Sequence, residues 1–176
     1  MGVAASRDFP YEFGETIESY EGKTLWKLSR GVKKADRAPV SILTFDAKKN
    51  PTKGAVASNF LKRSRTIRYP YLLPFIDGYE IEGTGVTIVT EEVTPLVDVL
   101  QELKGYPDSL SWGLYQIAKA LSFLNNECNM IHGNVTIDNI FVNKAGDWKL
   151  GGLELLSALS DQQGLIRNHN DIVSAK

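Results

Sequence analysis

The sequence has few of the residues that build metal sites, disulfides or membrane spans. It contains one cysteine, Cys128, and two histidines, which excludes an intramolecular disulfide and disfavours a structural zinc site. No apolar run approaches the ~18 residues that a membrane-spanning helix needs, and the N-terminus lacks the apolar core of a secretory signal. The formal net charge of −1 provides no broadly basic surface for nucleic acid. We therefore expect a cytoplasmic domain that holds no metal ion and binds no nucleic acid directly.

What is present is the composition of an ordinary globular domain. Hydrophobic residues make up 43% of the 176 positions and charged residues 23%, which is enough to bury a core. The first residues, MGVAAS, match the N-myristoylation pattern M-G-x-x-x-[ST], so Gly2 is a candidate lipid acceptor. A chance match is the equal alternative, and one myristoyl chain gives only marginal, reversible membrane binding.

The spacing of apolar residues predicts strands in the first half of the chain and helices later. Strands are expected over 24–32, 38–47, 72–83 and 85–93, with a short hairpin around the turn KAGD. Helices are expected over 55–68, 94–103 and 109–127, the last capped by Ser109 or Ser111. Segregated elements of this kind indicate an α+β fold rather than a wound parallel sheet.

The stretch HGNVTIDN, His132–Asn139, has the outline of the protein-kinase catalytic loop H-R-D-L-x-x-x-N. Together with DFPYEF, PVSILTFD, VTEEVTPL, SWGLYQIAKALSFL and WKLGGLE, it makes the sequence resemble the Scy-like family of N-terminal kinase-like proteins. The resemblance implies a protein-kinase-like fold, with a small β-rich lobe containing one main helix and the first part of a helical large lobe. It implies an N-terminal arm over 1–12, a small lobe over 13–93, a partial large lobe over 94–160 and a disordered tail over 161–176.

The small-lobe positions that hold ATP in a kinase carry other residues here. The stretch EGKTLWKLSRGV contains no G-x-G-x-x-G pattern, so close approach of the backbone to phosphate is not expected. Leu43 stands at the position of the strand lysine, and Phe60 stands where its glutamate partner falls on the following helix. An apolar contact between Leu43 and Phe60 would hold that helix inward without a ligand. Lys48 or Lys49 could replace the lysine, although their setting is typical of a solvated turn.

The catalytic loop is altered in the same way. Asn134 replaces the carboxylate that accepts the substrate proton, and Thr136 replaces the lysine that neutralises the γ-phosphate. We expect His132 to support the loop by hydrogen bonding. Asn139 is retained, either as a metal ligand or, as we favour, as a tie within the loop.

The metal-binding triplet D-F-G also differs. Gly152 stands at the position of its aspartate, and Glu154, two residues later, is expected to point elsewhere. With Leu43, Phe60, Asn134 and Thr136, the position of Gly152 completes a set of degenerate sites. We therefore expect no catalytic residue and no metal site.

A vestigial nucleotide pocket is the remaining candidate site. Thr90 occupies the position of the residue that guards the pocket, Glu91 to Val93 form the hinge-like segment, and Asn139 completes the set. An ordinary strand and turn would describe the same residues without a ligand. We expect no cofactor, with ATP at weak affinity as the one candidate.

The resemblance implies a catalytically inactive kinase-like domain that acts as an adaptor or scaffold in Golgi-related vesicle traffic or transfer-RNA export. Its implied partners are coat or trafficking proteins, and its implied location is cytoplasmic, at the Golgi or on a membrane surface. Two alternatives stay open: an atypical protein kinase that retains ATP through Lys48 and Glu154, and a binding module recruited to membranes through Gly2. Because no A-P-E motif or later large-lobe segment follows, helix 109–127 is expected to expose an apolar patch.

Overall fold

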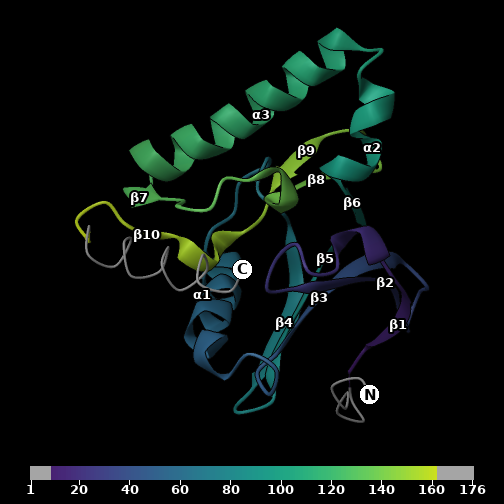
Figure 1. The fold of residues 1–176 in the computed structure, drawn as a ribbon, viewed down its shortest axis with the longest axis vertical. Helices are drawn as coiled ribbons and strands as arrows, with labels where there is room; N and C mark the ends of the chain where they lie inside the picture. The colour runs from purple at the N-terminus through teal and green to yellow at the C-terminus, as the bar shows by residue number, and fades with distance from the viewer. Residues whose placement is uncertain (1–8, 162–176) are drawn as a thin grey trace.

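The computed structural model describes residues 9–161, which form two lobes one above the other (Figure 1). The small lobe is an antiparallel sheet in the order β1-β2-β3-β5-β4, with helix α1 packed against it. Its elements are β1 (Tyr11–Thr16), η1 (Glu18–Tyr20), β2 (Lys27–Lys33), β3 (Pro39–Asp46), η2 (Pro51–Lys53), α1 (Gly54–Thr66), β4 (Phe75–Ile81) and β5 (Gly85–Glu91).

The second lobe is mainly helical and carries two small sheets, β6-β8-β9 and β10-β7. Its elements are β6 (Val93–Pro95), α2 (Leu96–Leu103), α3 (Pro107–Asn126), β7 (Met130–Ile131), η3 (Ile137–Asn139), β8 (Ile140–Asn143), β9 (Trp148–Leu150), η4 (Leu153–Leu155) and β10 (Ser157–Ala158). A sheet lobe followed by a helical lobe confirms the predicted α+β class.

Strand β3 is buried on both faces, and its alternation divides the small lobe into two cores. Val40 and Ile42 lie on one face in a cluster with Phe9 and Tyr11, whereas Leu43 belongs to the main core on the face that α1 covers. The sequence patterns did not predict β1, which begins at Tyr11, inside the segment expected to be an arm. Phe9 and Tyr11 are both buried, so this segment covers the outer face of the sheet.

Helix α1 confirms the helix expected before Pro70. Its buried side chains, Val56, Ala57, Phe60, Leu61 and Ser64, recur at three- and four-residue spacing. The chain turns to an extended conformation at the C-cap, Ile67. Arg63 and Arg65 lie in the last turn, where positive charge is favourable to the helix dipole.

Helix α3 crosses the top of the molecule and packs on the hairpin of β8 and β9 (Figure 1). The expected caps are wrong: the helix begins at Pro107, and its N-cap, Tyr106, makes no side-chain cap bond. Proline suits the first helical position because its missing N–H would have had no partner there.

The buried face of α3 is narrower than its leucine pattern predicts. Gly113 is required because a Cβ there would overlap the ring of Trp148. The side-chain amide of the buried Gln116 accepts a bond from the backbone N–H of Trp148 at 2.8 Å and donates to Asp147 Oδ1 at 2.7 Å. Leu114 and Ala118 share the three- and four-residue apolar spacing of this helix, yet both are exposed.

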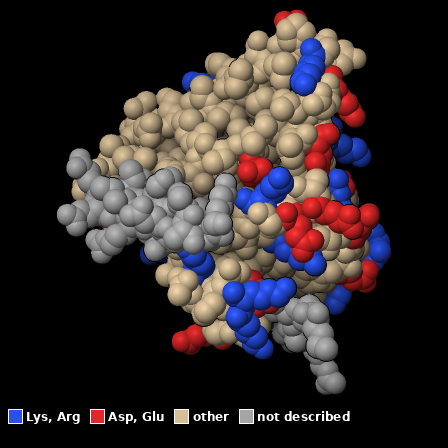
Figure 2. Space-filling model, in the orientation of Figure 1, with Lys and Arg blue, Asp and Glu red and all other residues tan. Residues whose placement is uncertain are grey.

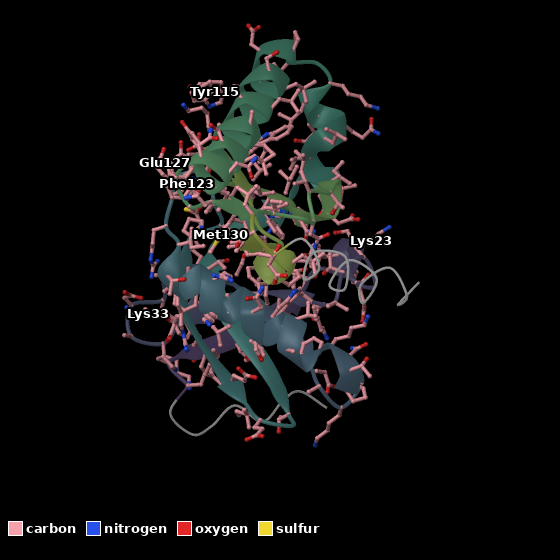
Figure 3. The ribbon with its side chains drawn as sticks, turned by 90° about the vertical axis from the view of Figure 1, so that its left-hand side faces the viewer. Lys23, Lys33, Tyr115, Phe123, Glu127 and Met130 are labelled. Carbon is pink, nitrogen blue, oxygen red and sulfur yellow. The ribbon has the colours of Figure 1, made fainter. Side chains whose placement is uncertain are left out.

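An apolar patch lies on the outer side of α3, as expected from the sequence. Trp112, Leu114 and Tyr115 are 50%, 62% and 49% exposed, and the rings of Trp112 and Tyr115 stack at 5.3 Å. Figure 2 shows this upper part of the molecule with few charged side chains, whereas acidic and basic groups gather over the small lobe. In Figure 3, the labelled residues Tyr115, Phe123, Glu127 and Met130 lie along the left side of the upper lobe, from Tyr115 near the top to Met130 lower down.

Candidate functional site

The loop between β7 and β8, residues 132–139, is held in place by His132. Its Nε2 lies 2.8 Å from the carbonyl oxygen of Gly151, and its Nδ1 accepts the Asn134 N–H at 3.2 Å. Burial lowers the pKa of His132 from 6.5 to about 4, so the ring is neutral at physiological pH. His132 therefore has the supporting contacts expected from the sequence.

Asn134, at the position of the kinase base, is turned toward a buried carboxyl group. Its Nδ2 donates to Glu154 Oε1 at 3.1 Å. Glu154 is 2% exposed, and burial raises the pKa of its carboxyl group to about 7. The side chain of Glu154 thus reaches back to the loop, and its backbone carbonyl oxygen accepts a bond from Asn59 Nδ2 of α1 at 2.8 Å.

The amide of Asn139 is used within the loop. Its Nδ2 donates to the backbone carbonyl oxygen of Asn134 at 3.0 Å and to Thr136 Oγ1 at 3.2 Å. The backbone carbonyl oxygen of Asn139 accepts the Gly151 N–H at 2.8 Å. These contacts are those of a tie within the loop, the role favoured from the sequence. They also give Thr136 a partner in the loop rather than a role toward phosphate.

Gly152, at the position of the metal-binding aspartate, is constrained by its backbone and by its neighbour. Its φ of 69° lies in the left-handed region, and an added Cβ would come within 2.5 Å of Asn139 Cγ. A carboxylate at this position would require the loop to move. Within residues 9–161, no group of three or more Asp, Glu, His or Cys side chains is arranged to hold a metal ion.

The positions of the kinase ion pair are filled by apolar side chains. Leu43 and Phe60 are 1% and 2% exposed and belong to the same core. The sequence did not indicate that Trp26 joins them: its ring stands edge-on to Phe60 at 5.1 Å and lies 6.0 Å from Phe45. Apolar side chains at both positions avoid the cost of an unpaired buried charge.

The alternative lysines lie on the surface. Lys48 and Lys49 are exposed in the turn after β3, and their backbone N–H groups donate to Asp46 Oδ1 at 2.9 and 3.4 Å. This is the solvated turn expected from their sequence setting. Lys149, which the sequence reasoning did not single out, is the buried lysine near the hinge: its Nζ donates to the Pro70 carbonyl at 2.6 Å and lies 4.0 Å from Glu91 Oε1.

The hinge-like segment makes its hydrogen bonds to the small lobe. Val93 N–H donates to Ser41 Oγ at 3.0 Å, and its carbonyl oxygen accepts from Ser41 Oγ at 3.3 Å and from the Arg30 guanidinium at 3.0 Å. Thr90 is 1% exposed and donates to the carbonyl oxygen of Glu91 at 2.9 Å. Both backbone polar groups of Val93 therefore already have partners in this chain.

Ser41 and Arg30 are the site residues that the sequence reasoning missed. A signal for Ser41 was present, because VSIL places a hydroxyl where the kinase motif V-A-I-K has an alanine. Ser41 lies on the same face of β3 as Leu43, toward the second lobe, and is fully buried. Arg30 also donates to Thr94 Oγ1 at 3.1 Å, so it bridges the two lobes from β2.

The fold and these altered positions define a protein-kinase-like domain without the groups that catalyse phosphoryl transfer. No protein-family model matches the chain. It is 46% identical over its whole length to the "Probable inactive serine/threonine-protein kinase scy1" of Dictyostelium discoideum, and 32% identical over 85% of its length to the cytoplasmic export protein 1 of Saccharomyces cerevisiae. The crystal structure of Cex1p superposes with a TM-score of 0.79 at 28% identity, over 97% of this chain and 32% of that one.

The chain belongs to the Scy1-like family of inactive kinase-like proteins. It spans about a fifth of the length of the curated relatives, covering 21% of the Dictyostelium protein and 19% of the yeast protein. In the part of the chain that the structure describes, no helix is both long and apolar enough to cross a membrane. The candidate lipid acceptor, Gly2, lies outside the described residues.

Restoring the aspartate of the metal triplet is expected to destabilise the domain. Gly152→Asp adds a side chain at positive φ and against Asn139, so we expect a loss of about 2 kcal/mol or more in the free energy of unfolding. Gly146→Asp is the matched control, since Gly146 has a φ of 86° but open space around it. We expect it to lose about 1 kcal/mol or less. Equal losses at the two positions in urea unfolding would contradict the steric explanation.

Glu154 and His132 are expected to give opposite pH dependences of stability. The carboxyl pKa of Glu154 is raised in the folded state, so the cost of ionising it grows as pH rises from its unfolded value of 4.5 to about 7. The ring pKa of His132 is lowered, so its cost grows as pH falls from 6.5 to about 4.

Glu154→Gln isolates the first of these effects, because the amide keeps an acceptor for Asn134 and cannot ionise. Relative to the parent chain, we expect its free energy of unfolding to rise by on the order of 1–3 kcal/mol between about pH 5 and pH 7.5. The control is Glu102→Gln on the exposed side of α2, which removes a carboxyl group from the surface instead of from the interior. A constant difference for Glu154→Gln in unfolding measured across this range would show that Glu154 titrates as it does in the unfolded chain.

Proposed function

We propose that this domain is a protein-interaction scaffold that works without binding Mg-ATP. The observation that carries the proposal is at the hinge, where Ser41 and Arg30 take both backbone hydrogen-bonding groups of Val93. An adenine ring would have to displace these partners in a buried region, where each lost bond costs about 1–3 kcal/mol. The phosphate end offers no compensation, because Asn134 and Gly152 supply no carboxylate for a metal ion.

The rival function, an atypical kinase that uses displaced residues, has less support. It needs Lys48 to reach the phosphates, but Lys48 lies exposed in the turn after β3. It needs Glu154 to hold magnesium, but that carboxyl is buried against Asn134 and its pKa is raised to about 7 by burial. Both groups have surroundings that oppose the roles the rival assigns to them.

The wider role that we propose is in cytoplasmic traffic, at the Golgi or in transfer-RNA export, with coat or trafficking proteins as partners. One relative carries export in its name, the yeast cytoplasmic export protein 1. Another, from mouse, is named for associating with the carboxyl-terminal domain of ezrin and is 40% identical over 53% of this chain. Names of this kind favour protein association over catalysis.

The absence of nucleotide binding is tested by thermal unfolding with ATP, with and without Mg²⁺. We expect no change in Tm at millimolar Mg-ATP, whereas a ligand at 100-fold its Kd would stabilise the fold by ~2.7 kcal/mol. An active kinase serves as the positive control. A magnesium-dependent rise in Tm, together with phosphate transfer that Glu154→Gln abolishes, would establish the atypical kinase instead.

Recruitment to membranes is a separate proposal that rests on Gly2. In cells fed a myristate analogue, we expect the parent chain to be labelled and Gly2→Ala to remain unlabelled, because the acyl group is attached to the amine of that glycine. Ala4→Gly, a change at a neighbouring position left open by the pattern, is the matched control and should keep the label. Absence of label on the parent chain would remove the membrane-recruited module.

A further inference from the structure

The segment that joins β1 to β2, residues 17–26, occupies the place where a kinase carries its glycine-rich loop. Here it is a folded element rather than an open hairpin. It contains η1, and its backbone is closed by bonds from Tyr20 N–H to the Ile17 carbonyl at 3.2 Å and from Lys23 N–H to the Tyr20 carbonyl at 3.3 Å. Its exposed turn carries Lys23, which points away from the molecule (Figure 3).

Each half of this segment inserts an aromatic ring into the main core. Tyr20 is 2% exposed, and its ring lies 5.7 Å from that of Phe141 in β8. Trp26 is 3% exposed and packs edge-on against Phe60 of α1. Aromatic side chains of this size bury about 150–250 Å² each and dominate the energetics of the contacts they make.

Phe141 identifies the place that Tyr20 fills. It pairs with Pro95 in β6, two residues after the hinge residue Val93, and it follows the catalytic-loop residue Asn139 by two positions. Burial of the Tyr20 side chain raises the pKa of its phenol group. Tyr20 therefore lies between the hinge side and the catalytic-loop side of the space between the lobes.

A second contact fastens the outside of the segment to the large lobe. Ser19 Oγ donates to Asp98 Oδ2, on the first turn of α2, at 2.7 Å. Ser19 and Asp98 are both exposed, so this bond alone is worth little in water. Because Ser19 is next to the buried Tyr20, the bond adds a second contact between this segment and the large lobe.

We propose that residues 17–26 form an intramolecular strap, in which Tyr20 takes the place of a ligand between the lobes and holds them in one closed arrangement. The strap connects β1 and β2 of the small lobe, and it contacts β8 and α2 of the large lobe. The closed arrangement then needs no nucleotide, and the surface offered to partners stays the same whether or not ATP is present. The biological purpose of the strap rests on the proposed scaffold function. Its geometry rests only on the contacts of Tyr20, Trp26 and Ser19.

Amide hydrogen exchange on the whole chain tests the strap directly. We expect amides of residues 17–26 to be protected at least tenfold more than those of the β4–β5 turn, residues 82–84. Tyr20→Ala should raise exchange at least tenfold both in the strap and in residues 137–143 of the large lobe, while β2 and β3 keep their protection. Tyr115→Ala, the same substitution at a half-exposed tyrosine of α3, is the matched control and should leave both segments unchanged.

Further variants test the strap if Tyr20→Ala unfolds the domain. Tyr20→Leu keeps apolar bulk and should give a smaller increase in exchange at the same two segments. In a Cys128→Ser background, Ser19→Cys with Asp98→Cys should form a disulfide under mild oxidation faster than Ser19→Cys with Glu102→Cys. Strap amides that exchange as fast as residues 82–84, or equal cross-linking of the two cysteine pairs, would overturn the proposal.

These outcomes separate the strap from the scaffold function. A protected strap together with a magnesium-dependent rise in Tm on adding ATP would support the strap as a contact between the lobes, but would remove both the nucleotide-independent function and the role of Tyr20 in place of a ligand. An unprotected strap without any response to ATP would do the reverse.

Discussion

A buried backbone N–H or carbonyl group without a partner is costly, and this cost governs the region between the two lobes. In a kinase the hinge can leave such groups for adenine, but here Val93 has Ser41 and Arg30 as partners. Because Ser41 belongs to β3 and Arg30 to β2, the same bonds that satisfy the hinge also join the sheet to the second lobe. Both backbone hydrogen-bonding groups of Val93 are therefore satisfied within the chain.

The same constraint explains why the catalytic loop keeps its shape after losing its chemistry. His132 and Asn139 are buried, and they supply partners for backbone groups of the loop and of Gly151, just after β9. Asn134 in turn donates to Oε1 of the buried Glu154 carboxyl group. Each residue is explained by the hydrogen bonds it makes inside the chain, and none requires a substrate.

Much of the fold follows from local patterns. The strand pairs, α1 and the β8–β9 hairpin were predictable because alternation, helical spacing and turn residues all act within a few positions. The degenerate positions Leu43, Phe60 and Gly152 were also readable, since they are single-residue departures from an ordered set of motifs. The start of α3 was misjudged because Pro107 suits a first helical turn as well as the serines suit a cap.

The sequence by itself determined the two-lobed α+β fold and the absence of catalytic carboxylates, because both depend on residue type at positions ordered along the chain. Only the tertiary structure decided which side chains meet across the region between the two lobes. Ser41 meets Val93 across 52 positions of sequence, and Tyr20 meets Phe141 between one lobe and the other. Contacts of this kind depend on how the lobes are packed, and no local pattern in the sequence encodes that packing.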